Sequence, residues 1–102
     1  MTTVSVGATP TPVLGPAQNS STGYKRSVYV SNPSAVTVYL MFDGGNQNQL
    51  TTTNGYPLVA GASLQIIPGV GGPEGSFPIY GIVASGTANI TVQSFLYAKE
   101  LP

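Results

Sequence analysis

The sequence has no cysteine, no histidine and no tryptophan among its 102 residues. Without cysteine, the chain can form neither disulfides nor thiolate metal sites, and it has no thiol nucleophile. Without histidine, it lacks the side chain that most often serves as a general acid or base near neutral pH. Three carboxylates remain for acid–base chemistry, Asp43, Glu74 and Glu100. They lie in a turn, a glycine-rich loop and the C-terminal tail, where solvated side chains are expected, so the sequence predicts no catalytic residue and no enzyme activity.

Charged residues are also scarce. Three basic residues, Lys25, Arg26 and Lys99, balance the three acidic ones, and charged residues make up 6% of the chain, against about 25% in an average protein. Nucleic-acid backbones are bound by clusters of lysine and arginine, so nucleic acid is not an expected partner. A net charge near zero weakens the repulsion between copies of a protein, which favours association.

Long apolar runs are missing. The longest, residues 38–42, is far shorter than the roughly 18 to 20 residues that cross a bilayer. The first ten residues, MTTVSVGATP, have neither the basic start nor the apolar stretch of a secretory signal. The sequence therefore predicts neither a membrane partner nor an export signal.

Ligands for a metal ion are sparse as well. Asp43 with the amide oxygens of Asn46 and Asn48 is the best candidate set for calcium, but a single carboxylate gives a weak site. Residues 69–75 contain four glycines, yet they lack the Gly-Lys-Ser/Thr ending and the following helix of a phosphate-binding loop. No metal and no cofactor are predicted.

What the chain does contain is a succession of short segments with apolar residues at every second position, the spacing of β-strands. In residues 25–31, for example, Val28 and Val30 share one face, and Val36 begins the inward set of the next segment. No window has helical spacing. The predicted strands are residues 25–31, 35–42, 63–66, 77–84 and 88–98, and the inward set of the last is Ala88, Ile90, Val92, Ser94 and Leu96. Together they predict one all-β domain, a small antiparallel β-sandwich or barrel with a jelly-roll-like layout.

Turn residues separate these segments. Asn54 and Gly55 form the pair that favours the positive backbone angles of a tight hairpin turn, and Pro57 protects the strand that follows. Gly61 and Gly86 are expected to make corners of the chain.

Residues 1–24 differ from the rest because they carry no charge and hold three prolines and three glycines. They predict an extended N-terminal arm preceding a sandwich domain of residues 25–102. Val4 and Val6, and then Val13 and Leu14, would each suit a short strand at a sheet edge, where proline is tolerated. The alternative interpretation is that residues 1–24 are a flexible terminus.

Four large side chains alternate with the predicted core positions: Tyr39, Met41, Phe95 and Tyr97. If their two strands are neighbours, these side chains form one apolar patch on the outer face, and we expect such a patch to be a subunit interface. A sandwich covered on both faces would give the same pattern.

Four stretches of the sequence resemble a known family. They are VGATPTPVLGP (6–16), KRSVYVSNPSAVTVYL (25–40), NGYPLVAGASLQI (54–66) and PIYGIVASGTANITV (78–92). Over most of the chain they are similar to small β-sandwich virion proteins of tailed bacteriophages, and the segments NGYPL-x-AG and ASGTA-x-ITV are the most characteristic. Residues 43–50 form a longer loop than the family pattern has.

The resemblance implies a capsid decoration or cement protein. Such a protein is made in the host cytoplasm and sits on the virion as a homotrimer, on the outer shell where major capsid proteins meet. It also implies that the N-terminal arm touches the capsid lattice. In this sequence the implied capsid contacts within residues 2–16 are Val4, Val6, Pro10, Pro12, Val13 and Leu14.

A virion surface binding module is the alternative function. A head-fibre domain that reads a receptor or glycan would use loop tyrosines together with the neutral amides of residues 46–49. Tyrosine suits this role because its ring has an apolar face and its hydroxyl a polar tip.

Overall fold

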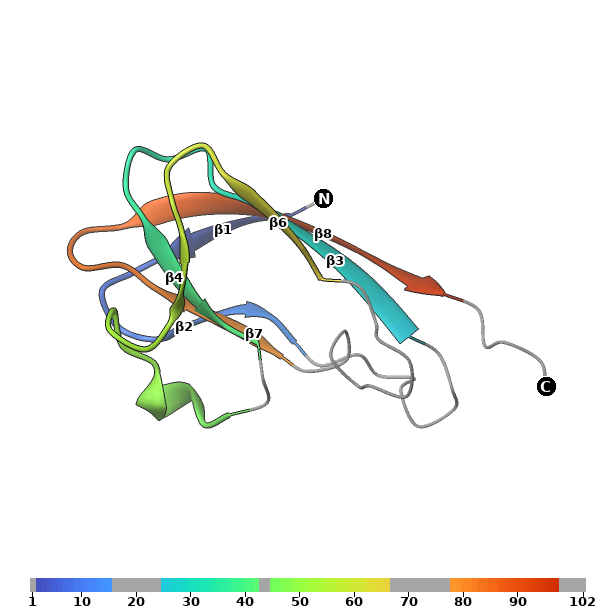
Figure 1. The fold of residues 1–102 in the computed structure, drawn as a ribbon, viewed down its shortest axis with the longest axis horizontal. Coiled ribbons are helices and arrows are strands. Elements are labelled where there is room, and N and C mark those ends of the chain that lie inside the picture. The colour runs from blue at the N-terminus through green and yellow to red at the C-terminus, as the bar shows by residue number, and fades with distance from the viewer. Residues whose placement is uncertain (1, 16–24, 43–44, 67–77, 98–102) are drawn as a thin grey trace.

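The computed structural model describes residues 2–15, 25–42, 45–66 and 78–97, without the side chains of residues 25–26 and 95–97. Two four-stranded antiparallel sheets pack face to face (Figure 1). Sheet A has the strand order β1 (Thr2–Val6), β8 (Ala88–Tyr97), β3 (Lys25–Ser31) and β6 (Ser63–Ile66). Sheet B has the order β2 (Thr11–Leu14), β7 (Ile79–Ile82), β4 (Val38–Met41) and β5 (Tyr56–Leu58). The all-β prediction is confirmed, and the two separate sheets make the fold a sandwich.

The core lies between the inner faces of the two sheets and is almost entirely aliphatic. The buried cluster is Val6, Val13, Val28, Val30, Val38, Leu40, Leu58, Ile66, Ile79, Val83, Ala88, Ile90 and Val92. Most of these residues alternate with polar ones along their strands, as predicted for Val28 and Val30 in β3. Burying a valine, leucine or isoleucine side chain contributes about 1.5–3 kcal/mol, so this alternation fixes which face of each sheet turns inward.

Residues 2–14 form edge strands of the sandwich, as expected for the segments with Val4 and Val6 and with Val13 and Leu14, so they are not an arm separate from a domain that starts at residue 25. β1 forms one edge of sheet A beside β8, and β2 forms one edge of sheet B beside β7. Val6 is completely buried and Val13 nearly so. Both valines point into the core between the two sheets, and their burial explains why this segment folds onto the sheets. Residues 16–24 of the predicted arm lie outside the described residues.

Strand β4 is shorter than the predicted strand 35–42. The main-chain oxygen of Val36 accepts a hydrogen bond from Asn32 Nδ2 (2.8 Å), and the Val36 N–H donates to Ser34 Oγ (3.3 Å). These bonds hold residues 34–36 in a bend, and Val36 is therefore 44% exposed instead of inward. Ser94, also predicted inward, is exposed, although its register partner Val28 on β3 is completely buried.

The backbone angles at the predicted glycine turns are as expected at Gly61 and Gly86 but not at Gly55. Gly61 and Gly86 have φ angles of 78° and 70°, which are the corner conformations expected of them. Gly55 does not have a positive φ, so the hairpin interpretation of Asn54 and Gly55 was wrong. Glycine is needed there for space, because a Cβ atom would lie 2.7 Å from Tyr39 Cβ. Pro57 lies on β5, an edge strand, where its missing N–H breaks no ladder.

Candidate binding surfaces

The four residues predicted as a subunit interface do not form one patch. Tyr39 and Met41 lie on β4 in sheet B, whereas Phe95 and Tyr97 lie on β8 in sheet A. By strand alternation Tyr39 and Met41 point away from the core on the outer side of sheet B. The prediction required neighbouring strands, and it fails because β4 and β8 belong to different sheets. The side chains of Phe95 and Tyr97 are outside the described set.

Part of the outer face of sheet B is covered by the chain itself, in the segment from residue 45 to 55. Leu50 in this segment is 2% exposed. A Cβ on Gly55 would lie 2.7 Å from Tyr39 Cβ and 3.0 Å from Leu50 Cδ1, so both side chains border the same space beside Gly55. Ile82, the register partner of Tyr39 on β7, is buried as well. The alternative interpretation of a sandwich with a covered outer face thus holds at Tyr39.

Two of the four neutral amides of residues 46–49, those of Asn46 and Gln47, hold their own loop in place. Asn46 Oδ1 accepts from the N–H of Asn48 (3.0 Å) and caps the short 3-10 helix η2 (Gln47–Gln49). Gln47 Nε2 donates to the Pro10 oxygen (3.0 Å), which ties the loop to the connection between β1 and β2. These bonds occupy Asn46 Oδ1 and Gln47 Nε2, whereas the side chains of Asn48 and Gln49 are exposed, so the glycan-reading loop stays a prediction.

The three carboxylates of the chain, Asp43, Glu74 and Glu100, which the sequence does not predict to be catalytic, all lie outside the described residues. The side chains of all six charged residues lie outside the described set. Every side chain that the structure describes is therefore uncharged. Within these residues no group of three or more histidine, cysteine, aspartate or glutamate side chains is gathered for a metal.

The predicted capsid contacts of the N-terminal segment divide by exposure. Val6 and Val13 are buried in the core, which contradicts their assignment as contact residues, because a partner cannot reach them while the sandwich is closed. Val4 and Leu14 are half-buried against the same core. Pro10 is half-buried and Pro12 is exposed. Prolines and the outward polar side chains of this segment are thus the ones a partner can touch.

The outer face of sheet A carries a continuous set of uncharged polar side chains, which we call the polar face. Register places them in rows across the strands, since residues opposed in antiparallel strands point to the same side. At its centre Tyr29 on β3 is flanked by Gln93 on β8 and Gln65 on β6. We define the polar face by Thr3, Ser5, Tyr29, Ser31, Ser63, Gln65, Asn89, Thr91 and Gln93, of which all but the half-buried Thr91 are exposed. Ser27 has the same outward position on β3 but is completely buried, so it is not part of the polar face.

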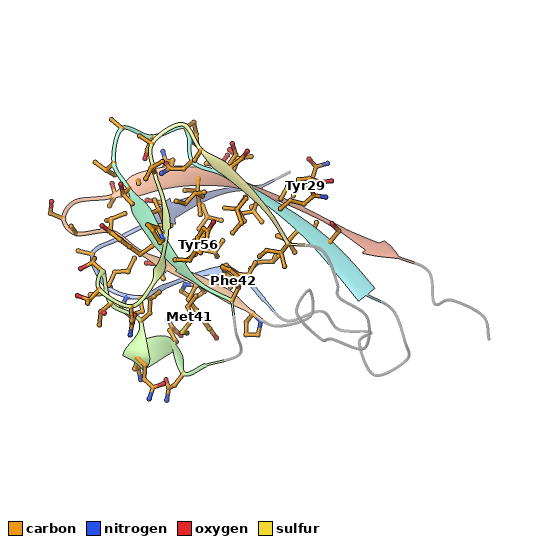
Figure 2. The ribbon with its side chains drawn as sticks, viewed as in Figure 1. Tyr29, Met41, Phe42 and Tyr56 are labelled. Atoms are coloured by element: carbon orange, nitrogen blue, oxygen red, sulfur yellow. The ribbon has the colours of Figure 1, made fainter. Side chains whose placement is uncertain are left out.

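Tyr29 is the aromatic centre of the polar face and is 40% exposed. Its hydroxyl accepts a hydrogen bond of 2.7 Å from Gln65 Nε2. Figure 2 shows Tyr29 on the side of sheet A away from Phe42 and Tyr56, whose rings meet edge to face at the inner side of sheet B. Sequence reasoning missed the polar face, because the pairing of β1, β8, β3 and β6 is what aligns these side chains. The signal available was the uninterrupted series of Ser, Thr, Asn and Gln at outward positions.

Comparison with protein-family models, curated proteins and solved structures finds no match to this chain. In the part of the chain that the structure describes, no helix has the length and apolar character needed to cross a membrane.

Proposed function

We propose that the protein is a structural virion protein that decorates the outer surface of a capsid as a homo-oligomer and stabilises the shell. The observation that carries the proposal is the polar face, nine uncharged side chains drawn from all four strands of sheet A. The similarity of the sequence to small β-sandwich virion proteins of tailed bacteriophages supports it. That similarity also implies a trimer, the major capsid protein as partner, and a role that needs no catalysis.

A surface of this kind suits attachment to a large assembly. Hydrogen bonds and van der Waals contacts between uncharged groups are not screened by salt, whereas contacts between exposed charges weaken as ionic strength rises. Several weak contacts made together by an oligomer gain orders of magnitude in avidity over a single one. We therefore expect attachment to the capsid to depend on many neutral contacts rather than on one strong site.

The test is binding to capsids. Purified protein is added to undecorated capsids of the phage that encodes it and sedimented with them at low salt and in about 1 M salt, where the Debye length falls to roughly 3 Å. We expect binding that is equal at both salt concentrations. Absence of the protein from purified virions, or binding that is lost in high salt, would contradict the proposal.

A pair of charge variants locates the contact. Gln65→Glu with Gln93→Glu places two negative charges in the polar face, beside Tyr29. Asn48→Asp with Gln49→Glu places the same charge on the exposed loop over sheet B. We expect capsid binding to fall in the first variant and to persist in the second, because carboxylates desolvated without a partner are costly. The reverse result would move the contact to the loop.

A specific observation favours a second function, a glycan-binding module on the virion surface. An exposed tyrosine between two glutamines offers an apolar ring together with amide donors and acceptors, the groups that recognise a neutral sugar. Specific binding on a glycan array that is lost in Tyr29→Ala and kept in Tyr56→Ala would establish this function. Tyr56 is the matched control because it is 48% exposed and lies on β5 of the other sheet.

A further inference from the structure

The edges of the two sheets differ in their protection against strand pairing. Sheet B has a proline in each edge strand, Pro12 in β2 and Pro57 in β5. Proline cannot donate a main-chain hydrogen bond, so it blunts an edge. The edge strands of sheet A, β1 (TTVSV) and β6 (SLQI), contain neither proline nor a charged residue. Sheet A is therefore the sheet whose edges can accept another strand.

Strand β1 presents an open edge. It ends the strand order of sheet A and pairs on one side only, with β8. Among the described residues, none of the main-chain hydrogen bonds made outside the strand ladders involves residues 2–6. In an antiparallel pair the residues outside each hydrogen-bonded pair point their N–H and C=O groups away from the partner strand. β1 thus offers a row of main-chain donors and acceptors, and Thr2, Thr3 and Ser5 beside it are exposed.

We propose that β1 pairs antiparallel with β1 of a second copy of this chain, about a two-fold axis at Val4. In this register Val4 faces Val4, Thr3 faces Ser5, and Thr2 faces Val6 of the other copy. The inference does not rest on the proposed function, and it gives a dimer where the resemblance implies a trimer. It replaces the patch of residues on β4 and β8 as the site of self-association.

The pattern of inward and outward side chains selects this register. Opposed residues must point to the same side of the joined sheet, so inward Val4 and Val6 must face even-numbered positions and outward Thr3 and Ser5 must face odd-numbered ones. Only the register centred on Val4 satisfies this rule and pairs all five residues of β1. It sets a threonine opposite a serine on the outer face, a favourable cross-strand pair.

The other edge of sheet A does not allow the same solution. β6 has four residues, so its full self-pairing would place inward Leu64 opposite outward Gln65. Pairing of β1 with β6 of another copy would be head-to-tail, so a dimer joined in this way would leave a free edge on each copy. A closed dimer therefore forms through β1 alone. The resulting sheet has eight strands, and the polar faces of the two copies lie on the same side of it.

Cysteine cross-linking tests the register directly, because the natural chain has no cysteine to interfere. Thr3→Cys and Ser5→Cys are made separately at these exposed positions. Opposed Cα atoms in an antiparallel pair are about 4.5–5.5 Å apart, within disulfide range. Identical positions in the two copies are two residues out of register and about 7–8 Å apart, at or beyond that range.

We expect the mixture of the two variants to form a disulfide dimer under mild oxidation at least about tenfold faster than either variant alone. Equal rates in the mixture and in the single variants would overturn the proposed register. No cross-linked dimer in the mixture would overturn the pairing of β1 altogether.

Solution mass provides the second measurement. Light scattering over a dilution series should show a monomer–dimer equilibrium for the natural sequence. Thr3→Lys puts a charge on the open edge and should raise the dissociation constant about tenfold or more. Asn89→Lys puts the same charge on the same face one strand further in, and should leave that constant nearly unchanged. A monomer at every concentration, or an oligomer that Thr3→Lys leaves intact, would contradict the proposal, and thermal unfolding of both variants verifies that they fold.

Discussion

The side-chain nitrogen Nδ2 of Asn32 donates a hydrogen bond of 2.7 Å to the main-chain oxygen of Leu58, 26 residues further along the chain. Asn32 follows the last residue of β3 in sheet A, and Leu58 ends β5 in sheet B. Asn32 is completely buried, and its main chain bonds to Gly61 and Ala62 as well. One side chain thus joins the connection that leaves sheet A to the connection that returns to it.

We expect Asn32→Ala to lower the free energy of unfolding by about 2–4 kcal/mol, because several buried groups lose their partners. Besides its bond to Leu58, Asn32 Nδ2 donates to the main-chain oxygen of Val36 (2.8 Å). Asn32 Oδ1 accepts a hydrogen bond from the hydroxyl of Ser34 (2.6 Å). Asn32→Asp should cost at least as much, since it keeps the shape but sets a carboxylate oxygen against two carbonyl oxygens. Urea unfolding of both variants measures the loss.

The exposed Asn48 is the control for this experiment. Its replacement by alanine should change the free energy of unfolding by no more than about 0.5 kcal/mol, as is usual for surface positions. A small effect of Asn32→Ala, equal to that of Asn48→Ala, would show that the link between the two connections contributes little to stability.

Gly55 and Gly61 should respond in opposite ways to asparagine. At Gly61 the φ of 78° is the constraint and no atom lies within 4 Å of an added Cβ, so asparagine, which tolerates this conformation, should cost less than alanine. At Gly55 the constraint is space beside Tyr39 and the Thr51 oxygen (3.2 Å), so the larger asparagine should cost more than alanine. The four variants are compared by thermal unfolding. The same order at both glycines would contradict these assignments.

Much of the fold was predictable because apolar and polar residues alternate so regularly. Val28 and Val30 point into the core as their spacing indicates, and Gly61 and Gly86 turn the chain where expected. The errors arose where tertiary contacts decide the outcome. Asn-Gly at 54 and 55 looks like a hairpin turn, but the conformation there is set by packing against Tyr39, a residue 16 positions away that no local pattern indicates.

The binding surfaces were harder to predict than the strands. Period-two counting correctly gives the outward direction of Tyr39 and Met41, yet it cannot say in which sheet a strand lies or what covers it. The chain covers Tyr39 with Leu50, a lone aliphatic residue in a polar loop. Tyr29 was counted as one of six tyrosines, and its place between Gln65 and Gln93 depends on strand order alone.

Val6→Ala should show that the N-terminal strand is part of the fold. We expect a loss of about 2 kcal/mol in the free energy of unfolding, because the substitution removes two buried methyl groups and leaves a cavity. Val59→Ala is the matched control, since Val59 is 54% exposed. Urea unfolding at equal protein concentration measures both. Equal and small losses would mean that residues 2–6 behave as a detached arm in solution.

Two asparagines of the loop that covers sheet B should differ in their response to aspartate. Asn54 uses both ends of its amide: Oδ1 accepts from the N–H of Thr51 (2.8 Å), and Nδ2 donates to the oxygen of Gln49 (2.7 Å). Asn54→Asp therefore loses a donor and sets two oxygens against each other, and it should lower the free energy of unfolding by about 1–2 kcal/mol. Asn46 only accepts, through Oδ1, from the N–H of Asn48.

Aspartate fills the accepting role of Asn46 equally well, so Asn46→Asp should leave the free energy of unfolding within about 0.5 kcal/mol of the natural value. The two substitutions change charge identically, and they lie in the same loop at exposed positions. Any difference between them in urea unfolding thus reports the lost donor at Asn54 and not the added charge. Because this loop holds Leu50 over Tyr39, Asn54→Asp should also expose Leu50 and speed amide hydrogen exchange in residues 49–55. Unchanged exchange together with equal stabilities would mean that packing of Leu50, rather than the Asn54 amide, keeps the outer face of sheet B closed.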